Sequence, residues 1–180
     1  MNSLIIIVVC VVLVLIIAYI SISNGLNRAI VKIDEAASGI DVALTKRYDV
    51  LTKMMDTCKS FVKHENEIMF KVIELRSGSS MQEKNDANKA MSENYKNLLA
   101  VAENYPELKS SETFTTLQKA ILDVEEHLQA ARRLYNSNVS IFNQKLVTFP
   151  SSMIASSKGL TKKEFFEAEE TKREDVKIDI

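Results

Sequence analysis

The chain has 180 residues with only 4 Gly and 2 Pro, where an average chain of this length carries roughly 13 Gly and 9 Pro. Because loop-rich and all-β proteins need these residues at their turns, the composition argues against both classes. Two His and two Cys leave little material for a metal site or a disulfide scaffold. A net charge of −1, from 23 basic and 24 acidic residues, gives no general attraction to nucleic acid.

The first 27 residues contain no charged side chain, and residues 4–22 form an apolar run of 19 residues. This length is close to the ~20 residues that a helix needs to cross a bilayer. A buried core helix is rarely this long. A cleaved signal peptide would suit the small pair Ser21 and Ser23, but it normally has a basic start and a shorter apolar run. We therefore expect a retained transmembrane anchor over 1–27 that contacts the lipid bilayer through residues 4–22.

The charges that flank the anchor indicate its orientation. No basic residue precedes the run, whereas Arg28 and Lys32 follow it directly and Lys46 and Arg47 lie near the edge of the relevant window. Basic residues favour the cytoplasmic side. The sequence predicts a single-pass protein of the cell membrane with its N-terminus outside and the rest in the cytoplasm. Cys58, as the one cysteine outside the run, fits a reducing compartment.

Beyond the anchor, apolar residues recur every three or four positions, which predicts long helices. The first covers about 28–76, continues directly from the anchor and ends at the Ser-Gly-Ser-Ser stretch 77–80. Gly39 interrupts it without any sign of a stop. The second covers about 82–104 and ends before Pro106.

The third helix, about 111–149, has the clearest pattern. Phe114, Ile121, Leu128, Tyr135, Phe142 and Phe149 are spaced by seven, which indicates a long packing surface. Asn138 falls on the second seam position and resembles a polar residue that sets register. Pro150 ends this helix.

The predicted fold class is all-α, with a single transmembrane helix followed by an antiparallel up-and-down bundle of the four-helix type. Three long helices and a short C-terminal one would form it. The expected domains are the anchor 1–27, the bundle 28–160, and a short helix with an extended charged tail over 161–180. Residues 105–110 are expected to run extended, 151–158 to form a helical turn, and 161–172 to form the short helix.

The sequence shows no catalytic, cofactor-binding or metal-binding pattern. The glycines are too scattered for a phosphate-binding loop. His64-Glu65 begins like a zinc-binding helix, but position 68 is Ile instead of the second His. His127 lacks the Glu three positions earlier that a di-iron bundle requires, because that residue is Val124. Cys58 lies on the apolar stripe, so we interpret it as a core residue.

Two short basic pairs lie next to tyrosines and could be read as nucleic-acid contacts. Lys46-Arg47 precedes Tyr48, and Arg132-Arg133 lies just before Tyr135. Acidic residues lie close to both pairs, so solvated faces with salt bridges are the favoured interpretation. We therefore predict no nucleic-acid partner.

Several motifs together resemble the LemA family. These are residues 47–49 (Arg-Tyr-Asp), 63–65 (Lys-His-Glu), 100–109 (AVAENYPELK), 130–136 (AARRLYN), Phe142-Asn143 and Phe149-Pro150-Ser151. Their order covers nearly the whole chain, which makes the resemblance specific. One departure is Thr52-Lys53-Met54, where the family usually has an Ile-Pro-Asn-like stretch. Without that proline, the first helix is expected to be straighter.

The resemblance implies a bacterial protein with one N-terminal membrane helix and a cytoplasmic four-helix bundle. It implies no enzymatic activity, because the family has no agreed catalytic residues. Some relatives are associated with formation of magnetosome membranes, which favours a structural role.

Three functions remain as hypotheses. The preferred one is a membrane-tethered, non-enzymatic scaffold without cofactor or small-molecule substrate, whose unknown protein partner would contact Tyr48, Tyr105 and Tyr135. The second is an enzyme or small-molecule sensor with a site in the bundle core. That site would need five side chains to converge, namely His64, Glu65, Glu103, Arg132 and Asn138. The third is a homo-oligomer that organises membranes.

Overall fold

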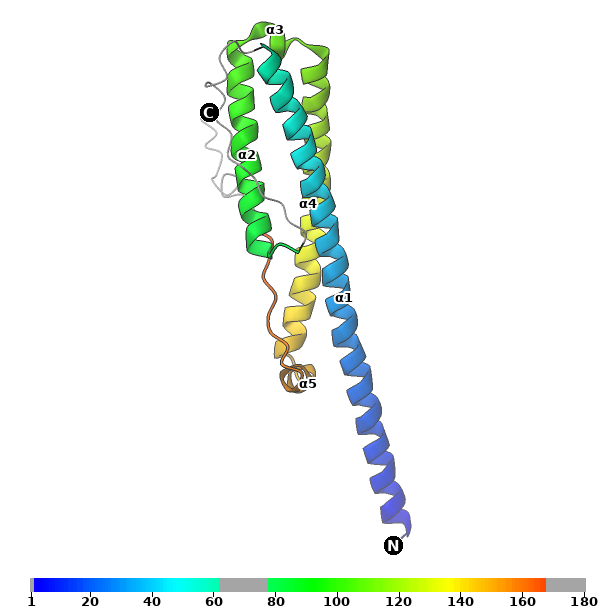
Figure 1. The fold of residues 1–180 in the computed structure, drawn as a ribbon. Helices are drawn as coiled ribbons and strands as arrows, with labels where there is room; N and C mark the ends of the chain where they lie inside the picture. Colours follow the sequence, from blue (N-terminus) through cyan, green and yellow to red (C-terminus); the bar gives the residue numbers. More distant parts are fainter. Residues whose placement is uncertain (1, 62–77, 168–180) are drawn as a thin grey trace, which may run out of the picture. The chain divides into compact units, whose positions relative to one another are not determined.

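The computed structural model describes residues 2–61 and 78–167 (Figure 1). Within these ranges the chain is helical and contains no strand, which confirms the predicted all-α class. The helices are α1 (Asn2–Phe61), α2 (Met81–Asn104), α3 (Pro106–Lys109), α4 (Glu112–Val147) and α5 (Ser151–Ser157). The predicted continuation of the first helix from residue 62 to 76 lies outside the described residues.

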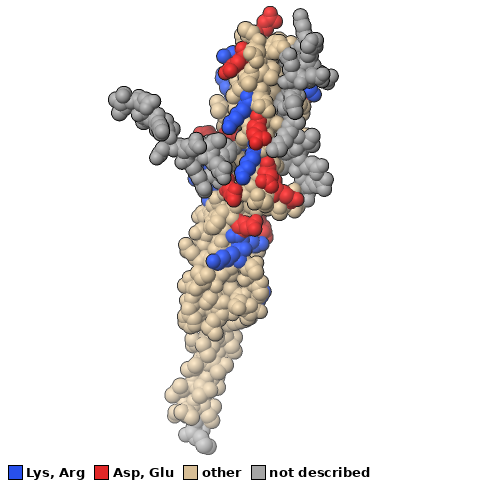
Figure 2. Space-filling view, turned by 90° about the vertical axis from the view of Figure 1, so that its left-hand side faces the viewer, with Lys and Arg blue, Asp and Glu red and all other residues tan. Residues whose placement is uncertain are grey.

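Helix α1 continues from the apolar run without a break, as predicted. Its large apolar side chains between Leu4 and Ile20 are exposed, and the most apolar 18-residue window has a mean hydropathy of 3.5. Figure 2 shows the N-terminal end of the chain without a single Lys, Arg, Asp or Glu on the visible face. By length and composition, α1 therefore contains one stretch that could cross a membrane.

The chain divides into two compact units. Of the described residues, the N-terminal unit contains 2–37 and 134–164, and the central unit contains 38–61, 78–133 and 165–167. Helices α1 and α4 each contribute residues to both units.

In the N-terminal unit, the end of α4 runs antiparallel to α1. The Asn138 side chain donates a hydrogen bond from Nδ2 to the Lys32 carbonyl oxygen at 3.0 Å. Seven residues further along α4, Lys145 donates from Nζ to the Gly25 carbonyl oxygen at 3.3 Å, seven residues back along α1. The buried apolar contacts of this unit come from both helices and α5: Leu26, Ala29, Ile33, Tyr135, Val139, Phe142, Ile154 and Ala155.

In the central unit, parts of α1, α2 and α4 lie side by side around one apolar core (Figure 1). The heptad residues Phe114 and Ile121 are fully buried there, as the seven-residue spacing predicts. The core cluster is Val50, Leu51, Met54, Cys58, Met91, Leu98, Ala102, Leu108, Phe114, Ile121 and Val124.

The start of α2 is fixed by a capping box. Ser80 Oγ accepts a hydrogen bond from the Glu83 amide at 3.2 Å, and the Ser80 amide donates to Glu83 Oε2 at 2.6 Å. Both bonds satisfy amides that the first helical turn leaves unpaired. Just before it, Gly78 has φ +86°, a left-handed conformation that glycine adopts without strain.

The link between α2 and α4 differs from the extended segment expected over 105–110. It forms the helical turn α3, with Pro106 at its first position. The fixed φ of proline suits a first helical position, and the turn buries Leu108 completely in the core of the central unit.

The expected helical turn at 151–158 is confirmed by α5. The short helix expected over 161–172 is wrong for its described part, because residues 161–167 are not helical. Their backbone pairs with side chains of α4 and α2 instead of with itself. Lys163 exchanges two hydrogen bonds with the Asn143 amide group, both at 2.9 Å, and the Glu167 amide donates to Asn85 Oδ1 at 3.2 Å.

Candidate functional site

The packed face of α2 is unusually polar. Five polar or charged residues are buried in the described chain, and four of them lie on this helix: Arg47 on α1, and Lys84, Asn85, Asn88 and Asn94 on α2. Buried polar groups need partners, because leaving one unpaired costs about 1–3 kcal/mol. The hydrogen bonds and ion pairs of these side chains therefore show how the buried polar face contributes to the fold.

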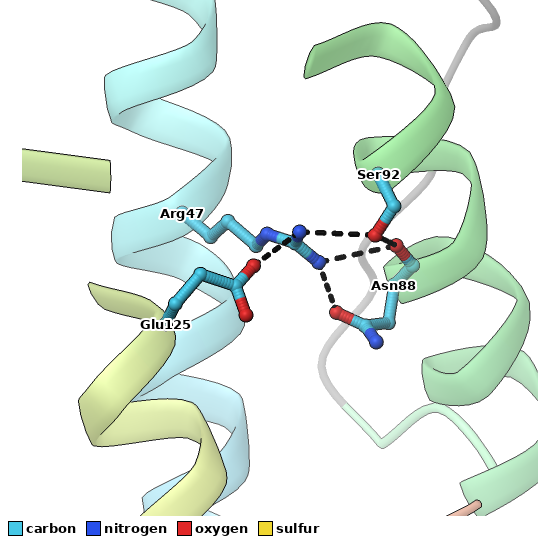
Figure 3. A network of polar contacts seen from close by, with 4 residues as sticks. All are labelled: Arg47, Asn88, Ser92 and Glu125. Carbon is cyan, nitrogen blue, oxygen red and sulfur yellow. Dashed lines mark hydrogen bonds and ion pairs between the residues drawn. The ribbon is translucent and has the colours of Figure 1, made fainter. Parts of the chain in front are cut away.

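Arg47 connects three helices of the central unit (Figure 3). Its side chain is 3% exposed and forms an ion pair with Glu125 on α4. Its Nη1 donates to the carbonyl and the side-chain oxygen of Asn88 on α2, and its Nη2 donates to Ser92 Oγ at 3.0 Å. Ser92 Oγ donates in turn to the Asn88 carbonyl at 3.1 Å.

The charge of Arg47 is compensated within this network. Burying a guanidinium costs several kcal/mol unless an opposite charge and further acceptors surround it. Glu125 supplies the charge while its own side chain keeps 25% of its surface exposed. Burial, and secondly the charge of Glu125, raise the pKa of the Tyr95 phenol, which keeps that hydroxyl neutral. The network is therefore a polar cross-link between three helices, in which both Nη atoms of the guanidinium already bind protein groups.

A second ion pair joins α1 to α2 nearby in sequence. Lys84 Nζ lies 2.6 Å from Asp41 Oδ1, with the lysine buried and the aspartate half-exposed. Asp41 and Arg47 are both on α1, and both reach residues in the first half of α2. The Lys84–Asp41 ion pair and the hydrogen bonds of Arg47 to Asn88 and Ser92 therefore join α2 to α1 at two places along the helix.

The C-terminal segment is held by a separate set of contacts. In the central unit, Phe166 is 1% exposed, the Glu167 amide binds Asn85, and Lys89 Nζ lies 3.6 Å from Glu167. In the N-terminal unit, Tyr135 donates from its hydroxyl to the Glu164 carbonyl at 3.0 Å. Burial, and then the charges of Glu164 and Asp34, raise the pKa of Tyr135.

The residues considered for a bundle-core site do not form one in the described chain. His64 and Glu65 lie outside the described residues. Glu103 is exposed in the last turn of α2, and Arg132 lies about 30 Å beyond the start of α4. Asn138 is used in its bond to the Lys32 carbonyl. Over the described ranges, no three His, Cys, Asp or Glu side chains are placed to hold a metal ion.

The remaining predicted residues have mixed outcomes. His127 is exposed, and its Nδ1 lies 2.9 Å from the Asp123 carbonyl oxygen. Cys58 is a fully buried core residue, as predicted, and burial raises its pKa to about 11. Tyr48 is 41% exposed, whereas Tyr135 is buried and cannot be a surface contact.

The interpretation of Arg47 as part of a solvated face was wrong. A signal for its burial exists in the sequence, because Leu26, Ile33, Ile40, Arg47 and Met54 are spaced by seven and all are buried. The neighbouring Tyr48 is exposed. An arginine inside a heptad of apolar residues therefore marks a buried polar contact.

These features define a class of protein before any comparison. The chain is all-helical over its described residues, carries one stretch that could cross a membrane, and uses its buried polar groups to join helices.

Comparison with known proteins agrees with the motifs. A model of the LemA family matches residues 36–180, and the chain belongs to this family. It is 31% identical to Protein LemA of Metamycoplasma hominis over 163 residues, which cover 88% of this chain and 74% of that protein.

More distant similarity extends to magnetosome proteins. The chain is 27% identical to magnetosome proteins MamQ 1 and MamQ 2 of Paramagnetospirillum magneticum over 70 residues, which cover 39% of this chain and 26% of each of those proteins. The names of these relatives denote no enzymatic activity.

Proposed function

We propose that this LemA-family protein is a non-catalytic helical scaffold anchored in the cell membrane by residues 4–22. The N-terminus lies outside, and the helices beyond the anchor form an antiparallel four-helix-type bundle in the cytoplasm. Arg28 and Lys32 directly after the apolar run support this orientation. The network in which Arg47 binds groups of α2 and α4 supports a structural use of the buried charges.

The exposed apolar surface of α1 carries the proposal. None of the most apolar 18-residue stretch of α1 is buried against other described residues. Each exposed Leu, Ile or Val leaves about 1.5–3 kcal/mol of burial free energy unused in water. A lipid bilayer recovers this free energy, and a continuous helix satisfies its backbone polar groups in lipid.

The anchor can be tested in the full chain by placing charges in the run. We expect the Val12→Lys/Ile16→Lys double variant to be lost from carbonate-washed membranes, because each lysine near the centre of a span costs about 2.5–3.5 kcal/mol. The matched control is Leu122→Lys/Leu134→Lys, since both leucines are exposed on α4. Equal membrane retention of the two double variants would contradict the anchor.

The scaffold role can be tested at Tyr48. This side chain is exposed on α1 and lies next to the buried Arg47, so a partner at this face would contact a rigid surface. A photo-crosslinking amino acid at position 48 of the full chain is expected to capture one specific membrane or cytoplasmic protein. The same probe at exposed position 122 is the control. Identical crosslinking patterns from the two positions would count against a partner surface at Tyr48.

Self-assembly is a second candidate that one observation favours. Leu134 and Ile141 are exposed on one face of α4, seven residues apart, and such a pair can pack against a second helix. The likeness to the magnetosome proteins supports a membrane-organising role. Sedimentation of the full chain in neutral micelles should then show oligomers that Leu134→Glu dissociates, whereas a strict monomer would exclude this candidate.

A further inference from the structure

A basic hollow lies in the N-terminal unit between α1 and α4. Its volume is about 280 Å³, and it is lined by three cationic side chains, Arg28, Lys32 and Lys145, together with Gly25, Ala29, Asn138 and Ile141. None of the described side chains that line it is acidic. The volume is near the lower end of small-molecule sites, which span roughly 300–1,000 Å³. Its chemistry therefore suits a small anion.

Gly25 and Lys145, on the anchor side of the hollow, lie at the height of the lipid headgroups if α1 crosses the bilayer as proposed, whereas Lys32 begins about 15 Å beyond Ile22 along the helix axis. The Lys145 ammonium group is 3.3 Å from the carbonyl oxygen of Gly25, three residues after the end of the apolar run at Ile22. Three residues of helix rise about 4.5 Å, and the headgroup layer is about 5–7 Å thick on each side. The side chains of Arg28 and Lys32 lean toward the helix N-terminus, and so toward the membrane.

The end of α4 presents a second membrane-compatible feature in the same unit. The antiparallel register of Asn138 with Lys32 and Lys145 with Gly25 places Val147 near Ser23, at the edge of the apolar run. Beyond it, Phe149 is 76% exposed, and Met153 on α5 is also exposed. Lys158, at the end of α5, donates from Nζ to Asn27 Oδ1 at 3.2 Å. Exposed apolar side chains flanked by lysines are typical of surfaces that lie in a membrane interface.

We propose that this hollow binds the phosphate of an anionic phospholipid headgroup. Arg28, Lys32 and Lys145 neutralise the phosphate, Asn138 faces the same hollow, and Phe149 and Met153 contact the acyl boundary. The inference rests on the proposed membrane anchor, because that anchor brings the hollow to the headgroup layer. Depth and charge together favour a lipid over a soluble anion.

The test uses the purified full chain in neutral detergent micelles, with bound lipid counted by native mass spectrometry. Short-chain phosphatidylglycerol is the probe, and phosphatidylcholine with the same acyl chains is the neutral comparison. We expect at least tenfold preference for phosphatidylglycerol. The Arg28→Gln/Lys145→Gln double variant should lose about fivefold for each cation removed, the effect of roughly 1 kcal/mol per basic residue near an anionic surface.

Two further variants separate charge from folding. Lys53→Gln/Lys119→Gln removes two exposed charges from the central unit and should bind phosphatidylglycerol like the wild type. Lys145→Arg keeps the charge and should retain the preference that Lys145→Gln weakens. The site would be overturned if Arg28→Gln/Lys145→Gln bound phosphatidylglycerol as well as the wild type does. Equal binding of phosphatidylglycerol and phosphatidylcholine by the wild type would overturn it too.

Inorganic phosphate distinguishes the two sources of this chemistry. Competition by inorganic phosphate at the same concentration as phosphatidylglycerol would overturn the lipid in favour of a soluble anion. Failure of the anchor has a different signature: the chain would stay soluble without detergent, whatever its lipid preference. A chain that needs detergent but binds both lipids equally keeps the anchor and loses the site.

Discussion

Arg47 occupies a position in α1 that its heptad neighbours fill with apolar side chains. Its burial beside Glu125, Asn88 and Ser92 replaces apolar packing with directional contacts that only one helix register satisfies. The spacing of seven places Arg47 on the packed stripe. The partners could not be predicted, because Asn88 and Glu125 are 41 and 78 positions away and helical periodicity says nothing about which residues meet between helices.

The two sides of this ion pair should respond differently to mutation. Glu125→Gln leaves a buried guanidinium with neutral partners only, and we expect a loss of about 2 kcal/mol of unfolding free energy, less than the 3–5 kcal/mol of a fully buried pair because Glu125 is partly exposed. Arg47→Met fills the space with apolar atoms and should cost less than about 1 kcal/mol. Thermal unfolding of the full chain in micelles, followed by circular dichroism, measures both.

The control for this pair is a double-mutant cycle. Glu125→Gln introduced into Arg47→Met should change stability by less than about 0.5 kcal/mol, because the charge that needed Glu125 is gone. The exposed Arg133→Ala is the matched surface change. If Glu125→Gln lowered the unfolding free energy by the same amount in the wild type and in Arg47→Met, the ion pair would not stabilise the fold.

Gly39 interrupts α1 without a structural need for glycine. A Cβ atom at this position would lie 3.9 Å from the Ala131 Cβ, an ordinary contact. Gly39→Ala should therefore raise the unfolding free energy by about 0.5–1 kcal/mol. Gly78→Ala should lower stability by about 1–2 kcal/mol, because its φ of +86° strains any side chain. The same unfolding measurement tests both variants. A loss of stability in Gly39→Ala would contradict the absence of a steric need for glycine at position 39.

Cys58 should make stability depend on alkaline pH. Burial raises the pKa of its thiol from 9.0 to about 11, so the unfolded chain releases this proton at lower pH than the folded chain. The contribution of Cys58 is complete below pH 9 and is lost as the pH rises toward 11. In a Cys10→Ser background, unfolding should become easier between these pH values, and Cys58→Ala should show a smaller decline. Maleimide labelling of Cys58 at pH 8 should be slow. Rapid labelling would contradict its burial.

At the scale of elements, helix boundaries were predictable and the C-terminal segment was not. The ends at Pro106 and Pro150 follow from local chemistry that the sequence displays, whereas the end expected before Gly78 lies outside the described residues. The extended conformation of 161–167 depends on Asn143, Tyr135 and Asn85, which are 20 to 82 positions away from the backbone groups that they bind. The local sequence of the segment does not show these distant partners.

Neighbouring phenylalanines in this segment give a matched test of its docking. Phe166 is 1% exposed and Phe165 is 49% exposed. Phe166→Ala should cost about 3–5 kcal/mol, whereas Phe165→Ala should cost less than about 1 kcal/mol. Phe166→Ala should also speed trypsin cleavage after Lys162 and Lys163, because the backbone they belong to loses its anchor. Similar cleavage of both variants would show that the segment is not held by Phe166.

At the scale of the whole molecule, composition determined the class. A chain with 4 Gly and 2 Pro has few positions at which loops can form, and its described residues are accordingly helical. The family also followed from motifs in the sequence, and the matched residues 36–180 confirm it. The basic hollow was not predictable, because it needs residues of α1 and α4 that only the antiparallel register brings together.

The orientation of the molecule should respond to charge before the span. The wild-type chain is expected to be protected when protease is added to intact cells and cleaved in inverted vesicles. Asn2→Lys/Ser3→Lys adds two basic residues on the N-terminal side and should shift a fraction of the molecules to the opposite orientation. The native residues Lys59 and Lys119 are exposed. Both lie too far from the span to oppose this shift. Cleavage of the wild type in intact cells would reverse the proposed orientation.

The unbroken course of α1 has a mechanical consequence. No hinge separates Ile22 from Leu26, Ala29 and Ile33, which pack in the N-terminal unit, so the proposed span shares one rotational phase with that packed face. Each residue of an α-helix turns by about 100°. One alanine inserted after Ser23 would thus rotate the span by roughly 100° relative to α4 without changing any other residue. A tilt or rotation that the lipid imposes on the span is therefore transmitted to the α1–α4 helix pair, because a continuous helix connects them instead of a flexible linker.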